Sequence, residues 1–384
     1  MDFDLTSQQI ALQTLARDFA NTYILPVAGR NDREEHFPHE IIEHLKPTGL
    51  LTPTLPSDIG GLNADFIGEA LVFEEIGKAC SSVRTILSVH NSLVTLTIQQ
   101  WGSESQRQHW LPRLAVGDEL GCFALTEFTA GSDATHQQLK AEKIDGGWRL
   151  NGRKAWVSSG TKATVCLLFA QTDADKGHRG IAAFLVPTAT AGFVAEKVDG
   201  KTGLRAAHTA HLNLTDVEVA DEALLGVVGE GFKIAMSALD NGRYGVAAGC
   251  VGQAQACLDA TIAYATQRQA FQRPLARFQL VQEIIADMTV NVEAARLLVY
   301  RAGHLKNQGL RNTRETSIAK LFATECAVHS ARQAIQAHGA VGFTDQYSVE
   351  RHLRDALATT IYEGTSQIQK LIIGRAMTGE NAFV

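Results

Sequence analysis

Hydrophobic residues recur with a helical period at both ends of the chain. Over residues 10–19, apolar side chains follow three- and four-residue steps, directly after a capping-box pattern at Thr6–Gln9. The same spacing returns over Phe66–Lys78. Near the C-terminus, an apolar stripe follows one helix face from Val281 to Val299, and residues 247–265 are apolar or small on nearly every side. This pattern predicts helices at the start of the chain and long, packed helices at its end.

The middle of the chain has the pattern of a β domain. From about Gly121 to Gly229, short runs rich in β-forming residues are separated in places by turn residues such as Gly146 and Gly147. Several such strands predict a compact antiparallel barrel or sandwich. The expected strands are Leu139–Lys143, Trp148–Leu150, Ala163–Gln171, Ile181–Val186, Phe193–Val198 and Ala210–Leu214.

The order of helices, strands and helices predicts three domains in an α+β fold that is mostly α. We expect an N-terminal α-helical domain at residues 1–120, a central β domain at 121–232 and a C-terminal α-helical bundle domain at 233–384. The prolines support this division. Because Pro274 is the only proline after Thr188, long helices are free to form in the last part of the chain.

Composition narrows the class of protein. The 384 residues are too many for one ordinary core, and a hydrophobic content of 45% excludes a disordered or fibrous chain. The net charge of −6 argues against a general nucleic-acid binder. The 6 cysteines form no Cys-x-x-Cys pair, which indicates free thiols in a reducing compartment. The acidic N-terminus lacks the features of a targeting signal and no run of ~18 apolar residues is present, so we expect a cytoplasmic protein without membrane insertion.

Motifs for several other chemistries are missing from the sequence. It contains neither a G-x-G-x-x-G motif after a strand nor a P-loop, and no G-x-S-x-G elbow of a serine hydrolase. The two His-x-x-His pairs, which begin at His36 and His208, lack the acidic residue of a zinc-protease helix. We therefore interpret them as surface or packing histidines and expect no metal site.

Two stretches have both a functional and a plainer structural interpretation. Cys122–Asp133 is an apolar strand followed by Thr-Glu and a small-residue turn, which would offer backbone N–H groups to an anionic ligand or simply form a β-turn. Arg268–Pro274 lies between two long helices. There Arg268 would suit a pyrophosphate and Phe271 a ring; the alternative is a helix-end cation beside a staple residue. Composition alone favours the structural interpretation in both cases.

Glu363 is the candidate for acid–base chemistry. It follows two apolar residues and precedes Gly364, which frees the backbone near a ligand. A carboxylate in apolar surroundings has its pKa raised towards neutrality, as suits a general base. Alternatively, Glu363 is an acid near a helix N-terminus that is capped by Thr365 or Ser366. The residues alone leave both interpretations open.

Taken in order along the chain, five segments resemble the acyl-CoA dehydrogenases, most closely the short-chain type. This resemblance covers nearly the whole chain and implies the family fold: an α-helical domain, a central β-barrel-like domain and a C-terminal four-helix bundle. The segments are CFALTEFTAGSDA (Cys122–Ala134), NGRKAWVSSG (Asn151–Gly160), GEGFKIAMSALDNGR (Gly229–Arg243), QAHGAVGFT (Gln336–Thr344) and IYEGTSQIQKLIIGR (Ile361–Arg375).

The resemblance implies an FAD-dependent oxidoreductase of lipid metabolism that converts a short or branched acyl-CoA thioester to its trans-2-enoyl thioester. Glu363 matches the base that abstracts the α-proton while flavin N5 accepts the β-hydride. Some members of the family carry the base at the position of Gly242, so the glycine there favours the short- and medium-chain arrangement. The alternative is a dehydrogenase or oxidase of an acyl or aminoacyl group that is held on a carrier protein in a biosynthetic pathway.

The resemblance also implies contacts with FAD, several of them made by residues of a neighbouring subunit. The residues expected to contact FAD are Phe123, Leu125, Thr126, Gly131, Ser132, Trp156, Ser158, Arg268, Phe271, Gln279, Gln336, Gly339, Thr365 and Gln367.

The partners implied are the thioester substrate, an electron-transfer flavoprotein as electron acceptor, and further copies of the chain in a homotetramer. The segment Ser88–Leu96 either helps to line the acyl pocket or packs as an ordinary helix. The residues expected to contact substrate are Ser132, Asp240, Arg243, Tyr362 and Gly364.

Four residues depart from the family pattern. Phe128 and Thr129 replace a Pro-Gly pair, Ala340 stands where a second glycine is usual, and His208 replaces a small hydroxyl residue. None of these departures removes a catalytic group. They leave the carrier of the acyl group, coenzyme A or a protein, open.

Overall fold

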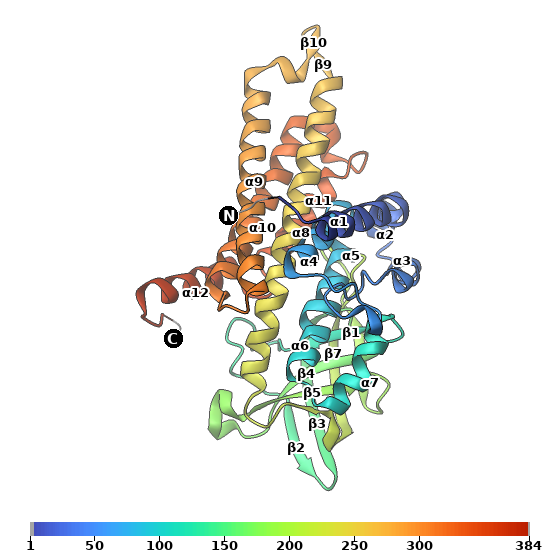
Figure 1. Cartoon of the computed structure of the whole chain (residues 1–384), viewed down its shortest axis with the longest axis vertical. Helices are drawn as coiled ribbons and strands as arrows, with labels where there is room; N and C mark the ends of the chain where they lie inside the picture. The colour runs from blue at the N-terminus through green and yellow to red at the C-terminus, as the bar shows by residue number, and fades with distance from the viewer. Residues whose placement is uncertain (1–3, 383–384) are drawn as a thin grey trace.

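The structure, a computed structural model, describes residues 4–382. Long helices form one end of the molecule and a sheet forms the other, while the first helices pack along the side (Figure 1). The predicted helix at Phe66–Lys78 is present as α4. The helices of the first part are α1 (Ser7–Phe19), α2 (Leu25–Arg33), α3 (His39–Leu45), α4 (Phe66–Ala79), α5 (Ser81–Ser88), α6 (Leu96–Trp101) and α7 (Glu104–Ala115), with a π-helical turn, Val89–Thr95, between α5 and α6.

Helix α1 begins as the sequence predicts. Thr6 Oγ1 accepts a hydrogen bond from the Gln9 N–H at 3.2 Å, and Gln9 Oε1 accepts one from the Thr6 N–H at 3.0 Å. These two bonds confirm the capping box. Leu12 and Phe19 of the predicted stripe are buried, whereas Ile10 is exposed.

The central part is one sheet in the strand order β6-β7-β3-β2-β4-β5-β8, with β1 beside β4. Every predicted strand is present. Strands β3 and β7 extend beyond the apolar runs, because half-exposed and exposed residues such as Asn151 and Arg153 alternate with buried ones along them. The strands are β1 (Gly121–Ala124), β2 (Lys140–Ile144), β3 (Gly147–Ser158), β4 (Val165–Gln171), β5 (Ile181–Pro187), β6 (Phe193–Lys197), β7 (Thr209–Ala220) and β8 (Leu224–Leu225).

The sheet is mixed, which differs from the purely antiparallel arrangement expected. Strand β1 pairs with β4 in parallel, and Lys140 of β2 pairs with Gln171 of β4 in parallel as well. The pairs of β3 with β2 and β7, and of β5 with β4, are antiparallel. A hydrophobic run predicts a strand but not its direction, so the parallel insertion of β1 after α7 was not visible in the pattern.

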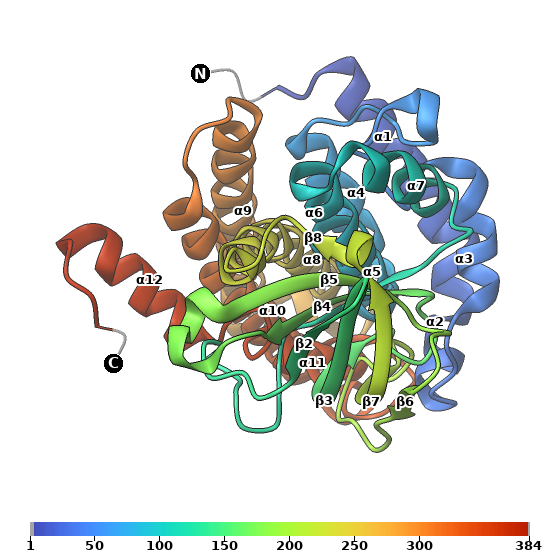
Figure 2. The same cartoon turned by 90° about the horizontal axis from the view of Figure 1, so that it is seen from below.

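The last part is built from long helices, as expected. A small hairpin of β9 (Gln269–Ala270) and β10 (Arg273–Pro274) joins α8 to α9 at the tip of the molecule, and α12 projects from its side (Figures 1 and 2). The expected boundary at residues 232 and 233 falls just inside α8. Within residues 4–382, no helix is both long and apolar enough to span a bilayer. The helices are α8 (Gly231–Gln267), α9 (Gln279–Asn307), α10 (Thr313–His338), α11 (Val349–Thr359) and α12 (Ser366–Thr378).

Helix α8 packs both in the core of the helical parts and against the sheet. Glycines let it approach α4 closely, since a Cβ on Gly252 would overlap with the backbone of Glu74. Buried residues of the first helices and of the bundle form one continuous core. Strands β4 and β5 are buried on both faces, and one of those faces packs against the first turns of α8.

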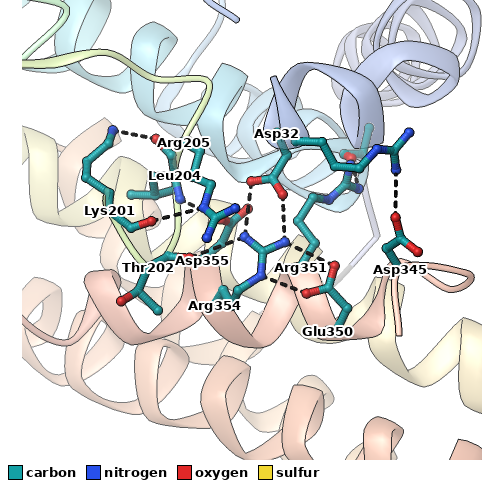
Figure 3. Close-up of polar contacts among 12 residues, drawn as sticks. Asp32, Lys201, Thr202, Leu204, Arg205, Asp345, Glu350, Arg351, Arg354 and Asp355 are labelled. Carbon is teal, nitrogen blue, oxygen red and sulfur yellow. Dashed lines mark hydrogen bonds and ion pairs between the residues drawn. The ribbon is translucent and has the colours of Figure 1, made fainter. Parts of the chain in front are cut away.

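An ion-pair cluster, here called the Arg354 cluster, joins α2, the loop before β7 and α11 (Figure 3). The Arg354 guanidinium donates to both carboxylate oxygens of Asp32, at 3.2 and 2.6 Å. It also donates to both oxygens of Glu350, at 2.7 and 3.0 Å, and to the Thr202 carbonyl at 3.2 Å. Every nitrogen of this guanidinium therefore has a partner within the protein.

Candidate active site

A cleft of about 1660 Å³ lies between the sheet, the helix α5 with its π-helical extension, and the bundle. It is the place where the predicted motifs meet. The segment Ser88–Leu96 contributes Ser88, Val89 and Leu93 to its wall. The predicted site residues that line it are Phe123, Leu125, Thr126, Gly131, Ser132, Trp156, Ser158, Asp240, Arg243, Tyr362, Glu363 and Gly364.

The other predicted residues lie outside this cleft. Phe271 sits in the tip hairpin and is 90% exposed. Tyr264, near the end of α8, stacks on His338 with ring centroids 4.3 Å apart, so the end of α10 lies close to the end of α8. Thr365 caps α12 by accepting a hydrogen bond from the Ile368 N–H at 3.2 Å. The predicted residues outside the cleft are Arg268, Phe271, Gln279, Gln336, Gly339, Thr365 and Gln367.

Glu363 lies in the turn between α11 and α12, in a strained conformation with φ of +54°. The turn is held by hydrogen bonds to its carbonyl groups. Arg243 Nε donates to the Glu363 carbonyl at 2.9 Å, and Lys320 Nζ donates to the Gly364 carbonyl at 2.9 Å. Gln369 Nε2 donates to both carbonyls, at 3.3 and 3.0 Å. These donors fix the direction in which the Glu363 side chain leaves the backbone.

The Glu363 carboxyl group faces the cleft without a partner. Its Oε2 atom is buried and accepts no hydrogen bond. Burial raises the pKa of Glu363 to about 7, although the charges of Arg84, Lys320 and Arg243 act in the opposite direction. Gly242 makes the space for this group, because a Cβ there would overlap with Glu363 Oε2. A free carboxyl with a pKa near neutrality has the properties of a general base.

Both sequence interpretations of this segment describe real features. Thr365 caps α12, as the structural alternative proposed, yet Glu363 precedes that cap and lies outside the helix. The residues alone could not decide between them, because the burial of Glu363 depends on α8 and α10.

Arg243 and Asp240 lie one turn apart on α8. Arg243 Nη1 donates to Asp240 Oδ1 at 3.0 Å, and Thr313 Oγ1 donates to the other oxygen of Asp240 at 2.7 Å. The Arg243 side chain is therefore held between Asp240 and the Glu363 carbonyl. It lines the cleft, but it also positions the turn that carries the base.

On the sheet side, an irregularity in β3 exposes an aromatic ring. The register between β3 and β7 shifts between Lys154 and Val157, and Trp156 there has a φ of +61° and is 58% exposed. His211 stands edge-on to its ring at 5.0 Å and also contacts Phe128 at 4.7 Å between centroids. Phe128 is one of the residues that depart from the family pattern, and its ring joins the aromatic group at the edge of the cleft.

A buried ion pair fixes the strand end that lines the cleft. Lys154 Nζ donates to Glu127 Oε1 at 2.8 Å and to the Leu125 carbonyl at 3.0 Å. Burial lowers the pKa of Lys154 to about 8. The β-turn that the structural interpretation predicted is also present. The Glu127 N–H donates to the Ala130 carbonyl at 3.1 Å, and the Ala130 N–H donates to the Glu127 carbonyl at 3.2 Å. The segment is thus a β-turn that also lines the cleft.

Sequence reasoning missed Arg84 and Thr85, which line the cleft from α5. The only local signal was an arginine among small and apolar residues. No histidine of the two His-x-x-His pairs lines the cleft itself, although His211 packs against Trp156 at its edge. His208 bonds to the Glu35 carbonyl at 3.0 Å. Within residues 4–382, no cluster of His, Cys, Asp or Glu side chains has the composition of a metal site.

Comparison with known proteins gives three matches to family models that together span most of the chain. They are the N-terminal, middle and C-terminal domains of acyl-CoA dehydrogenase, at residues 6–118, 122–217 and 229–378. The chain is 42% identical to the mitochondrial short-chain specific acyl-CoA dehydrogenase of Mus musculus, over 94% of this chain and 88% of that protein.

Two solved structures are also similar. Butyryl-CoA dehydrogenase from Megasphaera elsdenii is 39% identical, with a TM-score of 0.96 over 98% of this chain and 100% of that one. The prolyl acyl carrier protein oxidase AnaB is 29% identical, with a TM-score of 0.94 over 98% of this chain and 100% of that one.

Proposed function

The chain belongs to the acyl-CoA dehydrogenase family, and from this premise we propose that it oxidises a short acyl-CoA thioester to the trans-2-enoyl thioester. Members of the family are FAD-dependent oxidoreductases, and FAD is the cofactor of this chain. The observation that carries the proposal is the unpaired Glu363 carboxyl group with a pKa of about 7 in the cleft. This observation supports the role of Glu363 as the base, whereas the expected product follows from the family.

The residues of the cleft fit a flavin nucleotide. Trp156 offers an exposed ring face to the cleft, and aromatic surface of this kind suits contact with an isoalloxazine ring. A Cβ on Gly131 would meet no atom within 4 Å, so the backbone there is open to a large anionic group. We propose that Phe123, Leu125 and Thr126, with Trp156 and Ser158, would hold the ring, and that Gly131 and Ser132 would lie near the diphosphate.

The chain's own groups account for the proton transfer. Bound FAD supplies an acceptor for the β-hydrogen as hydride. Glu363 takes the α-proton on its carboxyl group, and its backbone N–H donates to the thioester carbonyl, where negative charge develops. Arg243 and Lys320 keep that peptide unit in place by holding the neighbouring carbonyl oxygens. Because the donors are already fixed, little reorganisation is needed during the reaction.

The predicted residues outside the cleft support a shared site. Arg268, Phe271 and Gln279 lie at the tip of the bundle, away from the cleft of their own chain (Figure 1). We propose that they contact the FAD of a neighbouring subunit, and that Gln336 and Gly339 contact the same FAD. Exposed apolar side chains such as Phe271 and Leu280 support burial of this tip in a homotetramer. An electron-transfer flavoprotein stays the expected electron acceptor, and a cytoplasmic location also stays a prediction.

A carrier-protein substrate is the second candidate, and the similarity to a prolyl acyl carrier protein oxidase supports it. Matched acyl-CoA and acyl-carrier-protein thioesters, added anaerobically to the purified holoenzyme, distinguish the two. We expect the CoA thioester to bleach the oxidised flavin absorbance. Bleaching by the carrier-protein thioester alone would favour the second candidate, and no bleaching by either would contradict both. Release of peroxide in air would identify an oxidase.

A further inference from the structure

Arg84 is a buried cation whose hydrogen-bonding groups are only partly used. The residue lines the cleft from α5 and is 1% exposed. Its Nη2 donates to the Tyr362 hydroxyl at 2.8 Å, whereas Nε and Nη1 are buried and have no partner. No carboxylate among residues 4–382 forms an ion pair with this guanidinium.

Such an arrangement is costly for a folded protein. A guanidinium stays protonated throughout the physiological pH range, and burial of a charge is unfavourable unless the charge is paired and hydrogen-bonded. Helix α8 nevertheless makes room for the side chain, because a Cβ on Gly249 would overlap with Arg84 Cδ and Nε. A cation that is accommodated in this way, and left unsatisfied beside a cleft, points to a ligand that completes it.

The surroundings of Arg84 are polar on one side and apolar on the other. Thr85 and Ser88 line the same cleft, and the buried Ser88 hydroxyl has no partner. Val89 and Leu93 line the stretch towards the base, where a Cβ on Gly242 would meet both Glu363 and Leu93. The cleft wall thus carries the apolar side chains of Val89 and Leu93 next to the guanidinium of Arg84 and the hydroxyl groups of Thr85 and Ser88.

We propose that Arg84 binds a carboxylate at the far end of the acyl chain, so that the preferred substrate is the thioester of a short dicarboxylic acid. The proposal rests on the proposed function and names the substrate class of the same site. It also disfavours a cationic aminoacyl group, because the guanidinium would repel an ammonium at the chain end.

The contacts also limit the length of the acyl group. Tyr362 directly precedes Glu363, and its hydroxyl reaches Arg84, so one tyrosine side chain bridges the turn of the base to the guanidinium. The acyl group must carry hydrogen on both its α- and β-carbons, which excludes malonyl. Succinyl and glutaryl are therefore the sizes to test.

Binding to a holoenzyme that cannot turn over provides the test. In a Glu363→Gln background we would compare glutaryl-CoA with pentanoyl-CoA, which has the same chain length and a methyl end, and with 5-hydroxypentanoyl-CoA. Succinyl-CoA and butyryl-CoA form the shorter pair. Dissociation constants come from calorimetry. We expect the carboxylate-ended thioester to bind at least about tenfold more tightly than either neutral one, as suits hydrogen bonds to a charged group.

A substitution assigns that preference to the guanidinium. Arg84→Met should remove the preference for glutaryl-CoA and leave pentanoyl-CoA binding equal or tighter, while Arg84→Lys, which keeps the charge, should retain part of it. Flavin content reports whether each variant is folded. If Arg84→Met does not fold, the carboxylate site is still tested by comparing the affinities of the thioesters for the Glu363→Gln protein, which keeps Arg84.

The outcomes separate this inference from the proposed function. Equal binding of glutaryl- and pentanoyl-CoA, or tighter binding of the hydroxyl-ended thioester, would overturn the carboxylate site. If pentanoyl-CoA bleaches the flavin of the unsubstituted enzyme but glutaryl-CoA neither bleaches it nor binds, the inference fails and the proposed function stands. If no thioester bleaches the flavin, the proposed function fails first.

Discussion

Arg354 and Arg84 show two opposite ways of holding an arginine in this fold. Arg354 has a partner for each guanidinium nitrogen, supplied by Asp32, Glu350 and the Thr202 carbonyl (Figure 3). Arg84 is more deeply buried, yet it has only the Tyr362 hydroxyl. The first arrangement is complete without a ligand, whereas the second is complete only with one.

The difference separates groups that stabilise the fold from groups that are kept ready for substrate. The Arg354 cluster joins three segments that are distant in sequence, and its carboxylates are paired. In the cleft, both the cation and the carboxyl group of Glu363 are unsatisfied. Among the buried polar side-chain atoms without a partner, those of Arg84, Ser88 and Glu363 belong to the cleft, where the family motifs also meet.

The largest effect should come from removing the base. Glu363→Gln keeps the size and polarity of the side chain but cannot accept the α-proton, so we expect kcat to fall by about 10³-fold or more. Anaerobic stopped-flow reduction of the flavin measures this loss. Because Arg243 and Lys320 bond to backbone carbonyls, the turn should persist and the protein should remain yellow. Turnover near that of the unsubstituted enzyme would mean that another group is the base.

A smaller loss should follow from filling the space beside the base. Gly242→Ala would place a methyl group against Glu363 Oε2, and a displacement of this kind lowers kcat by about 100-fold. Gly374→Ala is the matched control, because a Cβ there meets no atom within 4 Å and should leave the rate unchanged. Equal rates for the two variants would show that the position of Glu363 is not under this constraint.

Arg354→Met should affect stability and leave the chemistry intact. It leaves Asp32 and Glu350 unpaired, and we expect a loss of about 2 kcal/mol, below the cost of breaking a fully buried pair because the Arg354 side chain is 21% exposed. Urea unfolding measures this loss. Arg149→Met, which breaks the surface pair with Glu218, serves as control and should change nothing measurable.

Urea unfolding of Arg84→Met compares the contributions of the two arginines to stability. Removal of an unpaired charge should cost less stability than removal of a paired one, even though Arg84 is the more buried of the two. A larger loss for Arg84→Met than for Arg354→Met would reverse the interpretation of the two arginines.

The last prediction concerns the pH dependence of flavin reduction. Since burial raises the pKa of Glu363 to about 7, its carboxyl group is mostly protonated below that pH and cannot accept a proton. The rate of flavin reduction should therefore rise with pH through about 7, and fall about tenfold per unit on the acid side. A rate that is flat between pH 5 and 8 would contradict a general base with this pKa.

The hydrophobic pattern predicted the order of helices, strands and helices, because period and turn residues are local properties of a sequence. The longer extents of β3 and β7 and the parallel direction of β1 depend on partners elsewhere in the sheet, so they were not visible. The position of Glu363 followed from the family motif. Its burial, and the space that Gly242 leaves for it, arise where α8 meets the turn before α12.

Arg84 could not have been found from the sequence, for the same reason. Its state depends on Gly249 of α8 and on Tyr362 near the C-terminus, both distant in the chain. A local pattern records that an arginine is present, but not whether it meets a carboxylate. Likewise, no local pattern around Arg354 indicates that its guanidinium is fully paired.

The most direct test is an anaerobic titration of the unsubstituted holoenzyme with paired thioesters, followed by the loss of oxidised flavin absorbance. If the unpaired groups of the cleft are the catalytic and binding groups, short acyl-CoA thioesters will bleach the flavin, and glutaryl-CoA will do so at lower concentration than pentanoyl-CoA. An absorbance that stays unchanged with every short acyl-CoA would contradict the assignment of this cleft as an acyl-CoA dehydrogenase site.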